Sequence, residues 1–453
     1  MRRKDLAAAA IILFSLVTPG LDAAPELVVH EWGTFTALQD ESGKAIGGIN
    51  SDDEPVPDFV YNLAPKLLFP PEEPPANSKG GIRRCHSQVT MRLETPVVYF
   101  YPNEEFSYPV TVAVSFRGGW LTQYYPKARA EAFGLRPDGT GMLTFGYGSL
   151  GWGISLSASN EGPSTNSLVW NTPRQVDSAT VETHGEHEKF LFYRGVGNIE
   201  APVRVMRKEA EFIITRTRAS DRPDEIHQLW LVDIHSDGTA AFRVLQPFTE
   251  ETAFLVKTPS HLAPEEYSTD AVKDLKLAMR KALIEGGLFE KEADAMLNTW
   301  QASYFQSPGL RLFFLVPRKW TDGTLPLKVS IPRSDSRTPM PDVQPGVTRV
   351  MMGRIEIVTP EERAILKRIA GAGSRASAGK TWPDQAVPDD ETWNELLQAC
   401  RGLGRFRNAL LLDEQKRNPS PMLDRFIQRY QLQGYTPSFA EEPRGRPNVL
   451  MGP

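Results

Sequence analysis

The run Val110–Phe116, with the sequence VTVAVSF, consists mainly of β-branched and aromatic residues and is bounded by proline and glycine. Val97–Tyr101 (VVYFY), Lys189–Tyr193 and Glu211–Arg216 have the same character. Such side chains suit the pleated surface of a strand. Ile226–Leu245 predicts a hairpin, because two apolar runs flank a Ser-Asp-Gly turn. Many short strands separated by turn residues favour a sandwich or barrel-like pair of sheets.

Helical periodicity appears after this strand-rich part. Apolar residues recur at helical spacing over about Thr269–Ser303, with a break at Gly286–Gly287. Two β segments are expected next, at Leu310–Pro317 and Thr348–Val358. The sequence Thr359–Glu362 then predicts a helix start, because its threonine and last glutamate can form a capping box around a proline at the first helical position.

The expected fold class is α+β: a β-rich sandwich-like region followed by a helix-containing middle and a small helical C-terminal appendage. Residues 371–390 are rich in Gly, Ala, Ser, Pro and Asp and indicate a linker. Short helices are expected after it, at about Glu391–Leu403 and Met422–Gln433. The predicted division is therefore a signal peptide, a β-rich sandwich-like domain, a mixed helix and strand region that packs on it, the linker and the helical appendage, at 1–23, 24–265, 266–370, 371–390 and 391–453.

The N-terminus has the layout of a secretory signal peptide. A basic start at Arg2–Lys4 precedes the apolar run Ala7–Val17, and Pro19–Gly20 breaks that run before the small residues Ala23 and Ala24. A membrane anchor is the alternative, but the apolar run is too short to cross about 30 Å of hydrocarbon. The sequence therefore predicts an exported protein, periplasmic or extracellular.

Composition excludes several classes of protein. The formal net charge is -5 and no long Lys/Arg run occurs, so the chain lacks the electrostatic signature of a nucleic-acid-binding protein. No later stretch approaches 18 uninterrupted apolar residues, so a soluble mature chain without a transmembrane segment is expected. The two cysteines, Cys85 and Cys400, would form either one disulfide or two separate thiols; helical spacing around Cys400 also explains it as a core residue.

Three blocks of the chain resemble a known group of sequences. His30–Thr36 (HEWGTFT) is similar to the opening motif of a group of uncharacterised exported bacterial proteins. Arg92–Tyr101 (RLETPVVYFY) and Glu188–Gly197 (EKFLFYRGVG) also resemble this group. The resemblance implies export. It implies no particular chemistry.

One cluster of metal-ligand residue types stands out, because the chain has only seven histidines. His184, Glu186 and His187 lie within four residues and could converge on one divalent cation in a turn. The segment His30–Glu31 would complete the ligand shell only if the fold brought it close. The alternative is a solvated polar turn. The zincin helix motif is absent from the sequence.

His30, Glu31 and Glu94 are the candidate catalytic residues. They could act as general acid and base if they lined one cleft. The alternative is structural: a buried Glu31 would need a partner such as Arg92 or Arg194, and Glu94 would be held in the same way.

Two further motifs have competing interpretations. Gly146–Gly151 matches the dinucleotide-binding pattern letter for letter, but a strand is expected after it where that pattern needs a helix, so no cofactor-binding residues are assigned. The acidic loop Asp52–Glu54 offers oxygen ligands for calcium, but the EF-hand spacing is missing and a solvated loop is the default interpretation.

Aromatic residues suggest a different kind of site. Trp120, Tyr124, Tyr125, Trp152 and Trp170 fall in the β-rich part, where exposed rings would bind sugars and buried ones would form the core. The sequence thus favours a non-catalytic binding or structural envelope protein, with a glycan or an envelope protein as partner and without nucleic acid. The alternative is a metal-assisted hydrolase with a His/Glu site and a divalent metal ion.

Overall fold

The computed structural model describes the greater part of the chain, namely residues 27–52, 54–69, 85–104, 106–159, 161–217, 224–332, 334–335, 338–339, 342–372, 388–438 and 449–450. The expected signal peptide and most of the expected linker lie outside these residues. The fold is α+β, as the sequence predicted.

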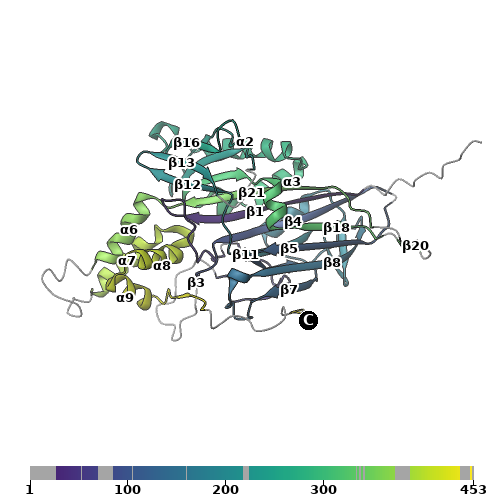
Figure 1. The fold of residues 1–453 in the computed structure, drawn as a ribbon, viewed down its shortest axis with the longest axis horizontal. Helices are drawn as coiled ribbons and strands as arrows, with labels where there is room; N and C mark the ends of the chain where they lie inside the picture. Colours follow the sequence, from purple (N-terminus) through teal and green to yellow (C-terminus); the bar gives the residue numbers. More distant parts are fainter. Residues whose placement is uncertain are drawn as a thin grey trace, which may run out of the picture.

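A nine-stranded sheet forms the centre of the molecule (Figure 1). Its strands, in spatial order, are β15 (Ala240–Val244), β14 (Leu229–Ile234), β17 (Gly309–Leu315), β21 (Val347–Ile357), β1 (Leu27–Gln39), β4 (Met91–Pro102), β11 (Leu191–Gly197), β6 (Gly119–Tyr125) and β2 (Tyr61–Asn62). Within the described residues, β1 and β21 are the one parallel pair in this sheet. The two β segments predicted after the long helical stretch are therefore confirmed, and they enter the sheet between β14 and β1.

A second sheet packs against one face of the first. It contains β10 (Glu186–Glu188), β9 (Thr180–Thr183), β8 (Tyr147–Ser157), β5 (Val110–Arg117), β18 (Leu327–Ser330), β7 (Arg129–Phe133) and β23 (Val449–Leu450). In β5 the side chains of Val110, Val112, Val114 and Phe116 are buried, and most of those between them are exposed, as expected for a strand with one face in the core. The buried residues join a large apolar core that also includes Phe35 of β1, so the two sheets form the predicted sandwich.

Helices cover the opposite face of the nine-stranded sheet (Figure 1). They are α2 (Ala271–Glu285), α3 (Glu290–Thr299) and α4 (Gln301–Phe305), which correspond to the long helical stretch with its glycine break. Trp32 and Tyr99 of the sheet pack here against Trp300 and Met296 of the helical layer. The fold also includes a small sheet of β12 (Val203–Lys208), β13 (Glu211–Arg216) and β16 (Leu255–Pro259), whose buried residues join the core of the sandwich, and the helices α1 (Leu168–Asn171) and α5 (Arg318–Thr324).

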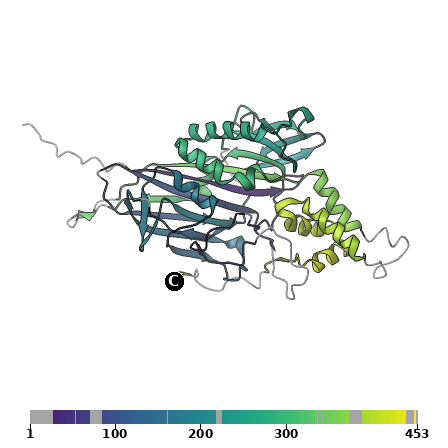
Figure 2. The same cartoon turned by 180° about the vertical axis from the view of Figure 1, so that it is seen from behind.

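Four more helices gather at one end of the sheets, as both views show (Figures 1 and 2). They are α6 (Pro360–Gly371), α7 (Asp390–Arg401), α8 (Arg407–Arg417) and α9 (Pro421–Arg429), with the short 3-10 turn η4 (Gly404–Phe406) before α8. The predicted capping box at the start of α6 is confirmed. The Thr359 hydroxyl accepts from the Glu362 amide at 3.2 Å, and the Glu362 carboxylate accepts from the Thr359 amide at 2.8 Å.

These C-terminal helices share a core with the body of the protein. Leu38 of β1 and Leu366 of α6 belong to the same apolar cluster as Cys400 of α7. After α9, β22 (Gly434–Tyr435) pairs with β3 (Cys85–His86), which connects the end of the helical part to the N-terminal half. Cys85 and Cys400 are both buried and do not form a disulfide with each other.

In the described part of the chain, no helix has the length and apolar character needed to cross a membrane.

Candidate functional site

His30 lies on β1 and forms a hydrogen bond with a helix of the covering layer. Its Nδ1 is 2.7 Å from Oε2 of Glu292 on α3. The Glu292 carboxylate also accepts from the Phe289 amide at 2.7 Å and from the Tyr101 hydroxyl at 2.8 Å. Both His30 and Glu292 are buried. This histidine therefore anchors α3 to the sheet.

Glu31 points to the other face of the sheet, because successive residues of a strand alternate. Its carboxylate accepts from Arg349 of β21 and from the Tyr193 hydroxyl of β11. The expectation that Glu31 forms a structural ion pair is thus confirmed, but the expected partners, Arg92 and Arg194, were wrong. Arg349 takes this role because the parallel register places it directly opposite Glu31.

Glu94 lies at the end of the molecule where the C-terminal helices begin. Its carboxylate is 2.8 Å from Arg405 and 3.2 Å from Arg92, and it accepts from the Tyr304 hydroxyl at 2.5 Å. Burial alone would raise the pKa of Glu94, but these guanidinium groups and that of Arg354 hold it well below its usual value.

The three candidate catalytic residues do not share one cleft. Glu31 faces the sandwich interior, whereas His30 and Glu94 face the helical layer. In the pairing of β1 with β4, His30 is opposite Tyr99 and Glu94 is opposite Thr34, four residues further along β1. At about 3.3 Å per residue this separates His30 and Glu94 by roughly 13 Å. The proposed acid–base set is therefore not assembled.

The candidate metal ligands lie on the β9–β10 hairpin and do not converge. His184 and Gly185 occupy the turn, both with positive φ. Glu186 accepts from the Tyr61 hydroxyl at 2.5 Å and from the Lys127 amide at 2.7 Å. The next residue, His187, points to the opposite face of the hairpin, with its Nε2 3.7 Å from Glu182.

His30 does not complete a metal site with this hairpin, since it is bound to Glu292 in the helical layer. Among the residues that the structure describes, no group of three or more His, Cys, Asp or Glu side chains is placed to hold a metal ion.

The remaining motifs have structural roles. The glycine pattern at 146–151 runs into β8, so the expected strand after it is confirmed. Asp52 is buried and bonded to Arg194 at 3.1 Å, so this part of the acidic loop is not a solvated calcium loop; Asp53 lies outside the described residues. The aromatic side chains considered for sugar binding are all buried, namely those of Trp120, Tyr124, Tyr125, Trp152 and Trp170. They cannot present an exposed face to a glycan.

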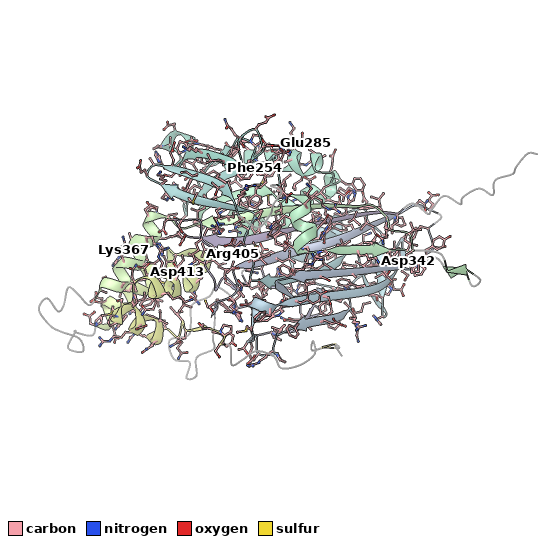
Figure 3. The ribbon with its side chains drawn as sticks, viewed as in Figure 1. Phe254, Glu285, Asp342, Lys367, Arg405 and Asp413 are labelled. Atoms are coloured by element: carbon pink, nitrogen blue, oxygen red, sulfur yellow. The ribbon has the colours of Figure 1, made fainter. Side chains whose placement is uncertain are left out.

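The best candidate site is a group of residues of which only Glu94 was identified from the sequence. We call it the arginine cluster. It comprises the residues Arg311, Arg354 and Arg405 with Glu94, Glu356 and Tyr304. Figure 3 shows Arg405 where the C-terminal helices meet the strands. The cluster lies at this junction, on β17, β21, β4, α4 and η4.

Two guanidinium groups in the cluster share one carboxylate. Nε of Arg311 is 3.4 Å from Glu356, and the two Nη atoms of Arg311 donate to backbone carbonyls. Arg354 donates through Nε to Glu356 at 2.6 Å and lies over the ring of Tyr304, 4.3 Å from its centroid. Burial lowers the pKa of Arg311 to about 10, which still leaves this group cationic at neutral pH. The cluster as defined therefore contains three guanidinium groups and two carboxylates.

The Nη1 atom of Arg354 has no hydrogen-bond acceptor among the described residues, although the residue is only 1% exposed. A buried donor without an acceptor is costly, and for a charged donor the cost is larger. Arg354 lines a pocket of about 110 Å³. The wall also includes Arg405, Glu356 and Glu362, with Gly404 on η4.

The pocket is large enough for a small anion. A single water needs roughly 10–15 Å³ of such space, so the cavity can hold several waters or one oxyanion group. Planar guanidinium groups recognise carboxylate and phosphate oxygens through paired hydrogen bonds. The arrangement can bind and orient an anion.

The fold and site thus define an α+β protein with a two-sheet sandwich, a helical layer and a polar pocket at the junction with the C-terminal helices. No protein-family model matches the chain, and no curated protein matches it. Among solved structures, a match is found to the Mu homology domain of Fcho1 from Danio rerio, solved with a bound Eps15 peptide. The two share 7% identity with a TM-score of 0.25, over 74% of this chain and 96% of that one. A similarity this low supports no inference about this chain.

Proposed function

We propose that this chain is an exported, non-catalytic binding protein that holds a small anionic ligand in the pocket of the arginine cluster. The observation that carries the proposal is the orphan Nη1 donor of Arg354, a buried residue that lines the pocket together with Arg405. The N-terminal pattern of Arg2–Lys4 and Ala7–Val17 supports export.

The chemistry of the pocket favours binding over turnover. Its cationic groups are held by Glu94, Glu356 and the ring of Tyr304, so their positions are fixed before a ligand arrives. The hydroxyl of Tyr304 donates to Glu94 at 2.5 Å, but burial and this carboxylate raise the pKa of Tyr304 well above its usual value, so the phenol stays protonated and is a poor nucleophile. Preorganised donors of this kind give affinity and selectivity.

Two other functions suggested by the sequence are not part of this proposal. Glycan binding through Trp120 or Trp152 would need exposed rings, and both are buried. A metal-assisted hydrolase would need His184, Glu186 and His187 on one ion, and neighbouring residues Glu186 and His187 point to opposite faces.

Gly404 provides a direct test, because it lines the pocket and a Cβ added there meets no atom within 4 Å. Its φ of +65° is one that Asn and Asp tolerate better than other residues. Gly404→Asp and Gly404→Asn are therefore nearly isosteric and differ in one negative charge beside the pocket.

Isothermal titration calorimetry with sulfate and with acetate tests the two variants against the wild type. We expect the wild type and Gly404→Asn to bind, and Gly404→Asp to bind roughly tenfold more weakly or worse, since a like charge a few ångströms away repels the anion. Equal affinity of the two variants, or no binding by the wild type, would refute the proposal. Thermal melts of both variants check that each is folded.

A further inference from the structure

A second carboxyl group, that of Glu362, lines the pocket. Its role in the capping box uses only one of its two oxygens. Glu362, on the first turn of α6, accepts from the Thr359 amide through Oε2 at 2.8 Å. Its other oxygen has no hydrogen-bond partner among the described residues, and the side chain lines the pocket together with Arg354 and Arg405. The capping box thus leaves one oxygen available to a ligand.

We propose, resting on the anion-binding function above, that the pocket takes up its anion together with a proton, which Glu362 carries on the oxygen that faces the ligand. The ligand class is then an oxyanion, because an oxygen of the ligand accepts the hydrogen bond from the protonated carboxyl group. Glu362 is in this account the residue that determines specificity.

Repulsion between like charges in a small cavity couples anion binding to protonation of Glu362. An ionised Glu362 and an anion in a pocket of about 110 Å³ would be like charges in close contact and poorly solvated. A protonated Glu362 removes the repulsion and adds a donor. By linkage, the proton and the anion each increase the affinity for the other by the same factor.

The groups around Glu362 raise its pKa, which favours its protonated form. Burial raises its pKa from 4.5 to about 7, and the carboxylates of Glu356 on β21 and Glu361 on its own helix add to the effect. Arg363 on α6 acts in the opposite direction, but this arginine is held by Glu41, Asp413 and Glu414 on the far side. Besides Glu356, the charged groups that line the same pocket from β21 and η4 are Arg354 and Arg405.

Glu362→Gln removes the titratable group at this position and preserves the fold. Glutamine can occupy the same position of a capping box, so the helix start is kept. Its amide is neutral at every pH and can still donate to an anion. Glu361→Gln is the matched control, because Glu361 is exposed on the same first turn and does not line the pocket.

The experiment is calorimetric titration of the full chain with sulfate, whose charge does not change near neutral pH. Measurements at about pH 7.5 in two buffers of different ionisation enthalpy give the number of protons taken up. We expect most of one proton for the wild type and for Glu361→Gln, and none for Glu362→Gln. Above about pH 7 the wild-type affinity should fall roughly tenfold per pH unit, and that of Glu362→Gln should stay constant.

Sulfate binding without proton uptake in the wild type, or the same pH dependence in Glu362→Gln, would overturn the coupling and leave the anion site intact. Absence of sulfate binding even at about pH 6, where Glu362 is protonated, would overturn both proposals.

Discussion

Glu31 and Arg349 lie directly opposite each other on the parallel strands β1 and β21, although 318 residues separate them in the chain. Their ion pair is almost completely buried, and the Tyr193 hydroxyl completes it. It joins the first strand of the described chain to a strand near the C-terminal helices. The ion pair therefore links two neighbouring strands of the nine-stranded sheet, in addition to their backbone hydrogen bonds.

Glu31→Gln should destabilise the fold by about 3–5 kcal/mol, because the buried Arg349 would lose its buried carboxylate and keep only the half-exposed Asp322 as an ion-pair partner. Urea denaturation followed by tryptophan fluorescence measures this. Glu285→Gln is the control, since the Lys281–Glu285 pair is exposed and its loss should cost no more than about 0.5 kcal/mol. Similar effects of the two substitutions would show that the buried pair does not stabilise the sheet.

Trp300→Ala should cost about 3–5 kcal/mol through the cavity it leaves. This indole is 1% exposed and packs against Trp32 at 5.8 Å and Tyr304 at 4.9 Å between ring centroids. Leu168→Ala, at a side chain that is 80% exposed, should change the unfolding free energy by less than about 0.5 kcal/mol. A small effect at Trp300 would mean that the helical layer does not pack on the sheet as described.

Acid should weaken the contact between the C-terminal helices and the body. Burial opposes ionisation of Glu41, but Arg363 outweighs it and lowers the pKa of this carboxyl group from 4.5 to about 2. A lowered folded-state pKa stabilises the protein above about pH 4.5, and that contribution is lost as pH falls towards 2.

The comparison of wild type with Glu41→Gln tests this. The difference in unfolding free energy should be present at neutral pH and should shrink as the pH falls from about 4.5 towards 2. It should be smaller than the pKa shift alone suggests, because the carboxylate is partly exposed and screened by solvent. A difference that stays constant over this range would contradict the assignment.

Local patterns were sufficient to predict much of the fold. Val110–Phe116 was identified as a strand because its β-branched and aromatic residues suit a pleated surface. Thr359–Glu362 was identified as a helix start because capping depends on residues close in sequence. The helix α8, Arg407–Arg417, was missed, since its apolar residues form one short run at Ala409–Leu412 without clear periodicity.

The candidate site could not be assembled from the sequence, because its residues come together only through strand pairing and helix docking. A signal was nevertheless present. Arg92, Arg311 and Arg354 each stand inside an apolar strand run, and a charge in such a place is rarely buried without a partner. Strand register decides which carboxylates they meet: Arg311, for example, lies opposite Glu356 in the pairing of β17 with β21. Register is a property of the folded sheet.

The central claim is most directly tested by a crystal structure of the protein soaked in selenate, with anomalous data collected at the selenium edge. We expect a selenium peak in the pocket, with a selenate oxygen within hydrogen-bond distance of Nη1 of Arg354. A pocket without a peak, with that Nη1 bonded to a group of the protein itself, would contradict the account.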